Sequence, residues 1–235
     1  MGDFGQAFAT AFGLIRELDP DLLEIVVLSL RVSLTATLVS CLIGMPFGAW
    51  IATSRFFGRG ALLTLMNALM GLPPVVVGLV VYLLVSRSGP LGWLELLYTP
   101  AAMVIAQTIL ITPIVAALSR QTIEDMDAEY REQFRSLVVP RGRAVGALLW
   151  DARFALLTVA LAGFGRAVAE VGAVVIVGGN IDHLTRVMTT AIALETSRGN
   201  LALALGLGIV LLLITLLVNA LVMSLRGRAA RYALA

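Results

Sequence analysis

The sequence predicts an all-α integral membrane protein, and three observations lead to this fold class. Of the 235 residues, 59% are hydrophobic and only 14% are charged. The mean hydropathy is +0.95, well above that of a soluble domain. A helix needs about 20 mostly apolar residues to cross a bilayer. Stretches of that length predict about five spans, at roughly 27–53, 61–86, 100–119, 154–178 and 201–225.

The chain begins with an expected interfacial helix over residues 1–20. Phe4, Phe8, Phe12 and Ile15 recur at helical spacing in a segment that is too short and too polar to span. A poorly ordered leader is the alternative. Asp19-Pro20 then reads as an N-cap followed by proline at the first helical position. We expect one transmembrane domain over 21–225 and a tail over 226–235.

Composition argues against nucleic-acid binding, a disulfide framework and a metal site. All positively charged side chains are arginine and the net charge is +2, so no nucleic-acid-binding face is indicated. Cys41 is the single cysteine and lies in an apolar run, which excludes a disulfide framework. His183 is the only histidine and has no companion ligands nearby, so we predict no metal site.

Arginine placement predicts the orientation, because cytoplasmic loops retain positive charge during insertion. With five spans, one set of loops contains Arg55, Arg59, Arg120, Arg131, Arg135, Arg141, Arg143, Arg153, Arg226, Arg228 and Arg231. The other set contains only Arg16, Arg87, Arg186 and Arg198. We therefore expect the N-terminus outside, the C-terminus in the cytoplasm, and the polar loop over 120–152 in the cytoplasm.

That polar loop has an amphipathic pattern. Apolar residues recur at helical spacing at Tyr130, Phe134, Leu137 and Val138. On the opposite face, Asp127 with Arg131 and Glu132 with Arg135 have the spacing of helical ion pairs.

The end of the pattern predicts a turn. Pro140 disfavours continuing the helix, and Gly142 permits a sharp redirection, so we expect a short helix, a turn and a second helix. The aromatic face suits a groove on a cytoplasmic partner. An ordinary connecting loop is the alternative.

Prolines and charges interrupt the spans. Pro73, Pro74 and Pro113 are expected to kink the second and third spans, either for a pathway or for packing alone.

Arg166 and Glu170 lie four residues apart in the fourth span and can pair. A neutralised structural pair is one interpretation, and a transport pathway lined by Arg166 is the other. Further pathway candidates are the neutral polar residues Asn67, Gln107 and Thr112.

The segment after the fourth span predicts an outer helix over Leu184 to Ser197, with Gly199 suited to end it. An exposed polar side is expected from Asp182, Arg186, Glu195 and Arg198. A connecting loop is again the alternative.

The polar loop resembles the EAA loop of bacterial ABC-importer permeases, a short cytoplasmic helix that begins with glutamate and precedes the penultimate span. Glu132 matches the motif glutamate. Gln133-Phe134 stand where the motif has two alanines, Val138 stands at its glycine, and Asp151 stands near its closing proline.

The flanking spans carry a closer resemblance. Residues 163–173, followed by Gly178-Gly179-Asn180-Ile181, are similar to the span after the EAA loop in permeases for molybdate, tungstate and sulfate. Residues 70–79 and 87–92 most resemble the tungstate-type branch, and the similarity extends roughly over 22–226.

The resemblance implies a MetI-like permease fold in the bacterial inner membrane. It also implies a homodimer, two cytoplasmic ABC ATPase subunits that bind ATP and magnesium, and an extracytoplasmic substrate-binding protein. No phosphate-binding Gly-x-x-x-x-Gly-Lys-Ser/Thr loop is present, so this chain is not expected to be the ATPase or to bind a cofactor. The outer polar residues would contact the binding protein. ATPase coupling would rest on Tyr130, Arg131, Glu132, Phe134, Arg135 and Leu137.

The expected function is an ATP-driven oxyanion importer subunit, with tungstate as cargo. Molybdate or sulfate is the alternative cargo. Two other classes remain open: a membrane-embedded enzyme that uses Glu170 or the Asp182-His183 pair, and a membrane anchor for another complex.

Overall fold

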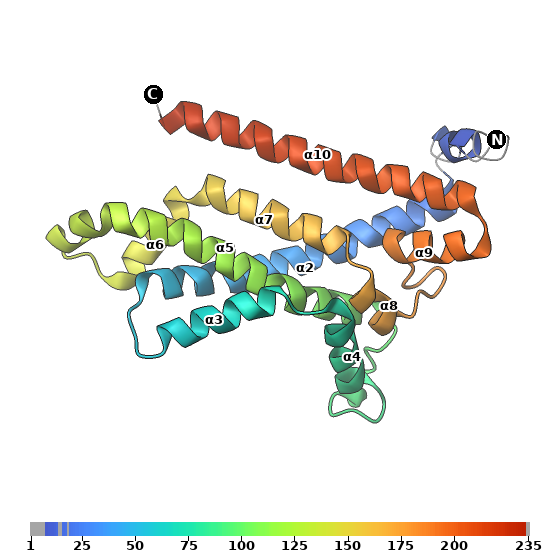
Figure 1. Cartoon of the computed structure of the whole chain (residues 1–235), viewed down its shortest axis with the longest axis horizontal. Coiled ribbons are helices and arrows are strands. Elements are labelled where there is room, and N and C mark those ends of the chain that lie inside the picture. Colours follow the sequence, from blue (N-terminus) through green and yellow to red (C-terminus); the bar gives the residue numbers. More distant parts are fainter. Residues whose placement is uncertain (1–7, 14–15, 18, 234–235) are drawn as a thin grey trace. The chain divides into compact units, whose positions relative to one another are not determined.

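The computed structural model describes residues 8–13, 16–17 and 19–233 (Figure 1). All regular elements within these ranges are helices, which confirms the all-α prediction. The described chain divides into two units. Unit 1 comprises residues up to 36, 73–107 and 165–218, and unit 2 comprises 37–72, 108–164 and the residues from 219 onward.

Three helices are long and apolar enough to cross a membrane. They are α2 (Pro20–Thr53), α5 (Pro100–Ser136) and the Leu201–Leu221 part of α10 (Leu201–Ala233). Two bent pairs raise the number to as many as five. These pairs are α3 (Arg59–Met70) with α4 (Pro74–Val85), and α6 (Arg141–Asp151) with α7 (Arg153–Val168).

The first helix begins as the sequence predicts. One carboxylate oxygen of Asp19 accepts hydrogen bonds from the backbone N–H groups of Asp21 and Leu22, both at 3.1 Å. These bonds satisfy donors that a helix start leaves unpaired. Pro20 occupies the first position of α2, where its missing N–H costs nothing.

The predicted kinks have different outcomes. Residues Gly71–Pro73 separate α3 from α4, and Pro74 opens α4 at its first position, so the second span is interrupted as expected. Pro113, in contrast, lies inside α5 and the helix continues through it. The fourth predicted span, 154–178, is itself divided, because α7 ends at Val168 and α8 begins at Gly172 (Gly172–Gly178).

Unit 1 contains a close pair of short helices, α4 and α8, which lie side by side in Figure 1. A Cβ on Gly78 of α4 would lie 2.8 Å from the Ala173 Cα of α8, so glycine permits this approach. The loop after α4 holds a single turn, η1 (Gly92–Leu94).

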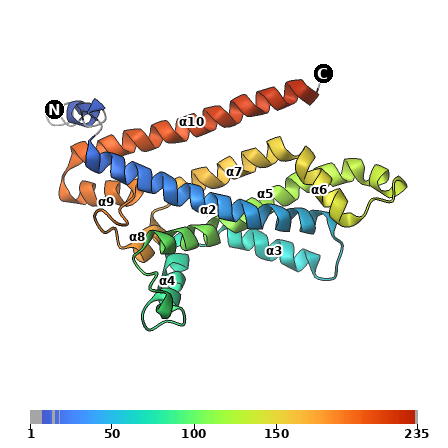
Figure 2. The same cartoon turned by 180° about the vertical axis from the view of Figure 1, so that it is seen from behind.

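The outer helix α9 (Met188–Arg198) also belongs to unit 1 and lies beside the start of α2 (Figure 2). Its first N–H, from Met188, donates to the Ser29 hydroxyl at 2.7 Å. The predicted helix start at Leu184 is four residues too early, whereas the end at Gly199 (φ 80°) is confirmed.

Unit 2 packs parts of α2, α5, α6 and α7 around one apolar cluster. Its buried members are Ala49, Ala52, Ile123, Leu148, Ala152 and Leu156. Helices α2 and α5 approach so closely that a Cβ on Gly48 would lie 2.4 Å from the Ala116 carbonyl oxygen.

Only part of the predicted interfacial helix is described. Residues 8–13 are helical, and Phe12 is exposed. Phe4 and Ile15 lie outside the described residues.

Candidate functional site

The polar loop is built on a continuation of α5. This helix runs for 37 residues from the apolar stretch to Ser136, without a break where the charges begin. The prediction of a separate short helix is therefore wrong, because helical hydrogen bonding continues after the apolar stretch has ended. The predicted turn and second helix are confirmed, since the chain turns back into α6 at Arg141 (Figure 1).

The turn between α5 and α6 is a Schellman motif. The Val138 N–H donates to the Arg135 carbonyl at 3.1 Å, and the Val139 N–H donates to the Phe134 carbonyl at 2.9 Å. Val138 takes a left-handed conformation, with φ of 50°. Glycine usually occupies this position of the motif. In this chain the backbone forms the same turn, although the branched Cβ of Val138 is sterically disfavoured at a positive φ.

The aromatic face of α5 is covered by the protein itself. Tyr130 and Phe134, whose ring centroids are 6.0 Å apart, are half-buried against the apolar cluster of unit 2. Both rings thus pack partly within unit 2, and their contact with a partner stays a prediction. The sequence pattern identifies an apolar face but cannot show that the apolar cluster of unit 2 packs against it.

The exposed end of α5 carries a different set of side chains, which we call the coupling tip: Glu132, Arg135, Leu137 and Val138. Leu137 is 73% exposed and Val138 is 83% exposed. Arg131 pairs with Asp127 at 2.7 Å, as predicted. Glu132 and Arg135 form no ion pair in the described part of the chain, which leaves both charges available at the surface.

The intramembrane charges also pair as predicted. The Arg166 guanidinium donates to the Glu170 carboxylate at 2.5 Å. The Glu170 side chain is buried, with 4% exposure, whereas 38% of the Arg166 side chain is exposed. The other Glu170 carboxylate oxygen accepts from the Ala173 N–H of α8 at 3.3 Å. Glu170 therefore both neutralises Arg166 and caps the first turn of α8.

Two further side chains bind backbone carbonyls at the α7–α8 break. The Gln107 side-chain amide donates to the Ala167 carbonyl at 3.1 Å, and the Thr189 hydroxyl donates to the Glu170 carbonyl at 2.8 Å. A helix end leaves carbonyls without a full helical partner, and the Ala167 carbonyl also accepts from the Glu170 N–H at 3.1 Å. The two side-chain bonds add to this backbone bond and stabilise the break. Nothing in the sequence singled out Thr189, because its partner is a backbone atom.

The remaining pathway candidates belong to unit 2, whereas the α7–α8 break belongs to unit 1. Asn67 is exposed on α3, in unit 2. Thr112 is half-buried on α5, also in unit 2, and donates to the Thr108 carbonyl of its own helix at 2.7 Å. The structure thus gathers Arg166, Glu170 and Gln107 in unit 1 and leaves the other two on elements of unit 2.

The outer polar residues are only partly exposed. Asp182 and Arg198 are 60% and 58% exposed, as predicted. Arg186 is largely covered and pairs with Asp182 at 2.6 Å. Glu195 is buried and accepts bonds from Arg198 at 3.2 Å and Asn200 at 2.9 Å. The prediction of an exposed side is therefore wrong for Arg186 and Glu195.

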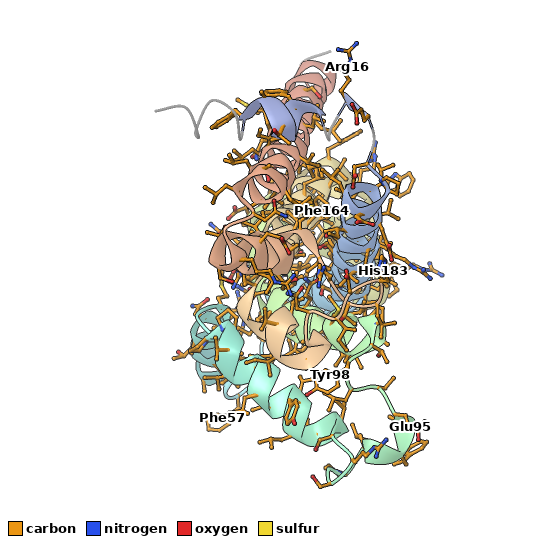
Figure 3. The ribbon with its side chains drawn as sticks, turned by 90° about the vertical axis from the view of Figure 1, so that its right-hand side faces the viewer. Arg16, Phe57, Glu95, Tyr98, Phe164 and His183 are labelled. Atoms are coloured by element: carbon orange, nitrogen blue, oxygen red, sulfur yellow. The ribbon has the colours of Figure 1, made fainter. Side chains whose placement is uncertain are left out.

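His183 lies at the surface of unit 1, beside α2 (Figure 3). Its Nδ1 is 2.8 Å from the carboxylate of Glu24. The hydrogen bond and charge of Glu24 raise the pKa of His183, with a smaller contribution from Asp182. Within the described residues no group of three or more His, Cys, Asp or Glu side chains is arranged to hold a metal ion.

The family model described as "Binding-protein-dependent transport system inner membrane component" matches residues 44–231. This match covers both broken spans, the coupling tip and the α7–α8 break. The chain belongs to this family. It is therefore an inner membrane component of a transport system, with partner subunits, as the resemblance in the second and fourth spans implied.

Relatives within the family match most of the chain. The tungstate uptake system permease protein TupB of Peptoclostridium acidaminophilum is 37% identical, over 94% of this chain and 97% of its own length. A probable anion ABC transporter permease protein of Haloferax volcanii is 39% identical, over 88% of this chain and 91% of its own length. The sulfate transport system permease protein CysW of Escherichia coli is more distant, at 32% identity over 69% of this chain and 58% of its own length. These relatives are permease subunits.

Proposed function

We propose that this chain is the permease subunit of an ATP-driven ABC importer for an oxyanion, and that its cargo is tungstate. Two tungstate uptake permeases share 37% and 41% identity with it, over 94% and 66% of the chain. A molybdenum transport permease matches at 29% identity and sulfate permeases match at 32%, which makes molybdate and sulfate the alternative cargoes.

The proposed assembly is a homodimer of this chain with two cytoplasmic ATPase subunits and an extracytoplasmic binding protein. ATP and magnesium bind to the ATPases, because this chain has no Gly-x-x-x-x-Gly-Lys-Ser/Thr loop. Arginine placement supports an outside N-terminus and a cytoplasmic C-terminus. Exposed Asp182 and Arg198 are the remaining candidates for contact with the binding protein.

The observation that carries this proposal is the continuity of α5. At a rise of 1.5 Å per residue, the 37 residues of α5 extend for about 55 Å from Pro100 to Ser136. The apolar stretch and the coupling tip thus lie at opposite ends of one helix. A displacement of the tip by the ATPases is therefore transmitted along one helix. Gln107, which binds the α7–α8 break, lies on the same helix. Closing of the ATPases would thereby bias the spans between inward and outward openings.

The oxyanion pathway would use the partly exposed guanidinium of Arg166. Its neighbour Glu170 is buried and already bonded to it, which limits the positive potential that an anion meets. A transport pathway must bind weakly enough to release its cargo, so a half-neutralised arginine suits it. Thr112 and Asn67 are secondary candidates.

The test is co-purification of the ATPase with matched surface variants. Leu137 and Trp93 are similarly exposed, at 73% and 77%, but only Leu137 belongs to the coupling tip. We expect Leu137→Glu to lose the ATPase and Trp93→Glu to retain it. If Leu137→Glu is folded and retains the ATPase fully, this docking site is wrong. If the folded wild-type chain captures no ATPase, the importer assignment itself fails.

The cargo is tested separately, in proteoliposomes that contain the complete transporter and its binding protein. We expect ATP-dependent uptake of tungstate to exceed that of molybdate and sulfate at equal concentration. Preference for sulfate or molybdate would replace the cargo and leave the importer assignment intact.

A further inference from the structure

A groove in unit 2 collects arginine side chains next to the coupling tip. Its volume is about 920 Å³, and it is lined by residues 52–55, Arg59 and several residues of the α5–α6 region. We call it the arginine groove after Arg55, Arg59, Arg131 and Arg135. These four side chains come from the loop after α2, the start of α3 and the last turns of α5.

The two carboxylates that line the groove do not neutralise all of its arginines. Glu124 accepts from Arg59 at 2.8 Å and also pairs with Arg120, while Asp127 pairs with Arg131. Both acids are thus already engaged. Arg55 and Arg135 are exposed, and no ion-pair partner for either is found among the described residues. Two guanidinium groups are left to bind an anion.

Aromatic side chains lie on the chain just before and after Arg55. Phe47, Trp50 and Phe56 form a stack, with ring centroids 6.0 Å apart in the first pair and 5.3 Å in the second. All three rings are exposed, and Phe57 is completely exposed. Tryptophan and other aromatic residues with arginines beside them are typical of the membrane–water boundary, where rings meet the acyl chains and charges meet the headgroups.

From this juxtaposition we infer that the arginine groove binds the phosphate headgroup of an anionic phospholipid, whose acyl chains lie along the Phe47–Trp50–Phe56 stack. Guanidinium groups bind phosphate oxygens through paired, charge-assisted hydrogen bonds, which suits Arg55 and Arg135. A zwitterionic headgroup would bring its own cation toward the same arginines. The site therefore favours phosphatidylglycerol over phosphatidylcholine.

The inference depends on membrane insertion and not on the cargo or the direction of transport. An inorganic anion would use the arginines but not the aromatic stack. An acidic segment of the ATPase would use the arginines from the aqueous side, without a requirement for acyl chains. The observation that favours a lipid is the exposed aromatic stack, of which Phe56 follows Arg55 directly in the chain.

The test is native mass spectrometry of the complete transporter, titrated with phosphatidylglycerol or phosphatidylcholine. The double variant Arg55→Gln/Arg135→Gln removes the two unpaired charges. The matched control, Arg87→Gln/Arg143→Gln, removes two exposed arginines that do not line the groove. We expect the Kd for phosphatidylglycerol to rise about tenfold or more in the first variant, because two charge-assisted contacts are lost. The control should stay close to wild type.

Several results would overturn the inference. Equal affinity for the two lipids, or an unchanged Kd in the groove variant, would exclude a headgroup site. Complete displacement of phosphatidylglycerol by inorganic phosphate or tungstate at equal concentration would assign the groove to a free oxyanion. Lipid binding that occurs only after the ATPase is removed would assign it to an acidic ATPase segment.

Two controls separate this test from the proposed function. Arg135 belongs to the coupling tip, so ATPase capture is measured in the same preparations. If the double variant is unstable, Arg55→Gln alone provides the test, with Arg143→Gln as its control. Loss of lipid selectivity in Arg55→Gln, at a residue outside the coupling tip, while ATPase capture and uptake persist supports the groove. Lipid selectivity that remains while capture is lost counts against the groove and is consistent with the role proposed for the coupling tip.

Discussion

Val138 is a branched residue in a backbone conformation that favours glycine. It is the left-handed residue of the Schellman motif that ends α5, with φ of 50°. A branched Cβ is disfavoured there by about 1–2 kcal/mol, whereas glycine is not. The EAA resemblance places a glycine at this position, and the structure supplies the physical reason for that preference.

Val138→Gly should therefore stabilise the α5–α6 turn by about 1 kcal/mol, because it removes the steric conflict. Thermal unfolding of the purified protein in detergent measures the change. Val139→Gly is the control: Val139 has no positive φ, so the extra backbone freedom should lower its stability. A lower melting temperature for Val138→Gly than for wild type would show that its exposed side chain makes contacts worth more than the strain.

At the scale of elements, some helix boundaries could be predicted from sequence and others could not. Asp19 caps α2 as predicted, because a cap is a local interaction between a side chain and the next turn. The continuity of α5 was missed because charge marks the limit of the apolar stretch and not the limit of the helix. Tyr130 and Phe134 were identified as one apolar face, but tertiary packing decided what covers them.

The close packing of α2 against α5 at Gly48 can be tested by substitution. A Cβ on Gly48 of α2 would lie 2.4 Å from the Ala116 carbonyl oxygen and 2.9 Å from the Arg120 nitrogen, both backbone atoms of α5. Gly48→Ala should destabilise unit 2 by about 1–3 kcal/mol, because these atoms cannot move aside as a flexible side chain would.

The matched substitution is Gly60→Ala on α3 of the same unit, where an added Cβ meets no atom within 4 Å. It should be neutral or slightly stabilising. Thermal unfolding of both variants in one detergent provides the comparison. Equal melting temperatures for the two variants would mean that α2 and α5 are not packed at this distance.

At the scale of the whole molecule, the fold class and family followed from composition and from motifs in the second and fourth spans. The functional site was less predictable. Arg166 and Glu170 were paired correctly because their spacing is local. Thr189 was missed because it donates to a backbone carbonyl 19 residues away. Arg186 and Glu195 were wrongly placed at the surface because the packing of the folded segment, which their spacing does not reveal, covers both side chains. Pairs three or four residues apart were thus only partly predictable: Arg131 pairs with Asp127 and Arg166 with Glu170, whereas Glu132 and Arg135 form no ion pair among the described residues.

Orientation is a whole-molecule property, and labelling of single cysteines tests it. Cys41→Ala removes the native thiol. In this background, Ser88→Cys places a thiol in the exposed loop between α4 and η1, and Leu137→Cys places one at the coupling tip. Because arginines are concentrated in the loops on the side of the coupling tip, we expect a membrane-impermeant maleimide to label position 88 in intact spheroplasts. Position 137 should react only after permeabilisation, and less when the ATPase is bound. Labelling of position 137 in intact spheroplasts would reverse the orientation and place the tip out of reach of a cytoplasmic ATPase.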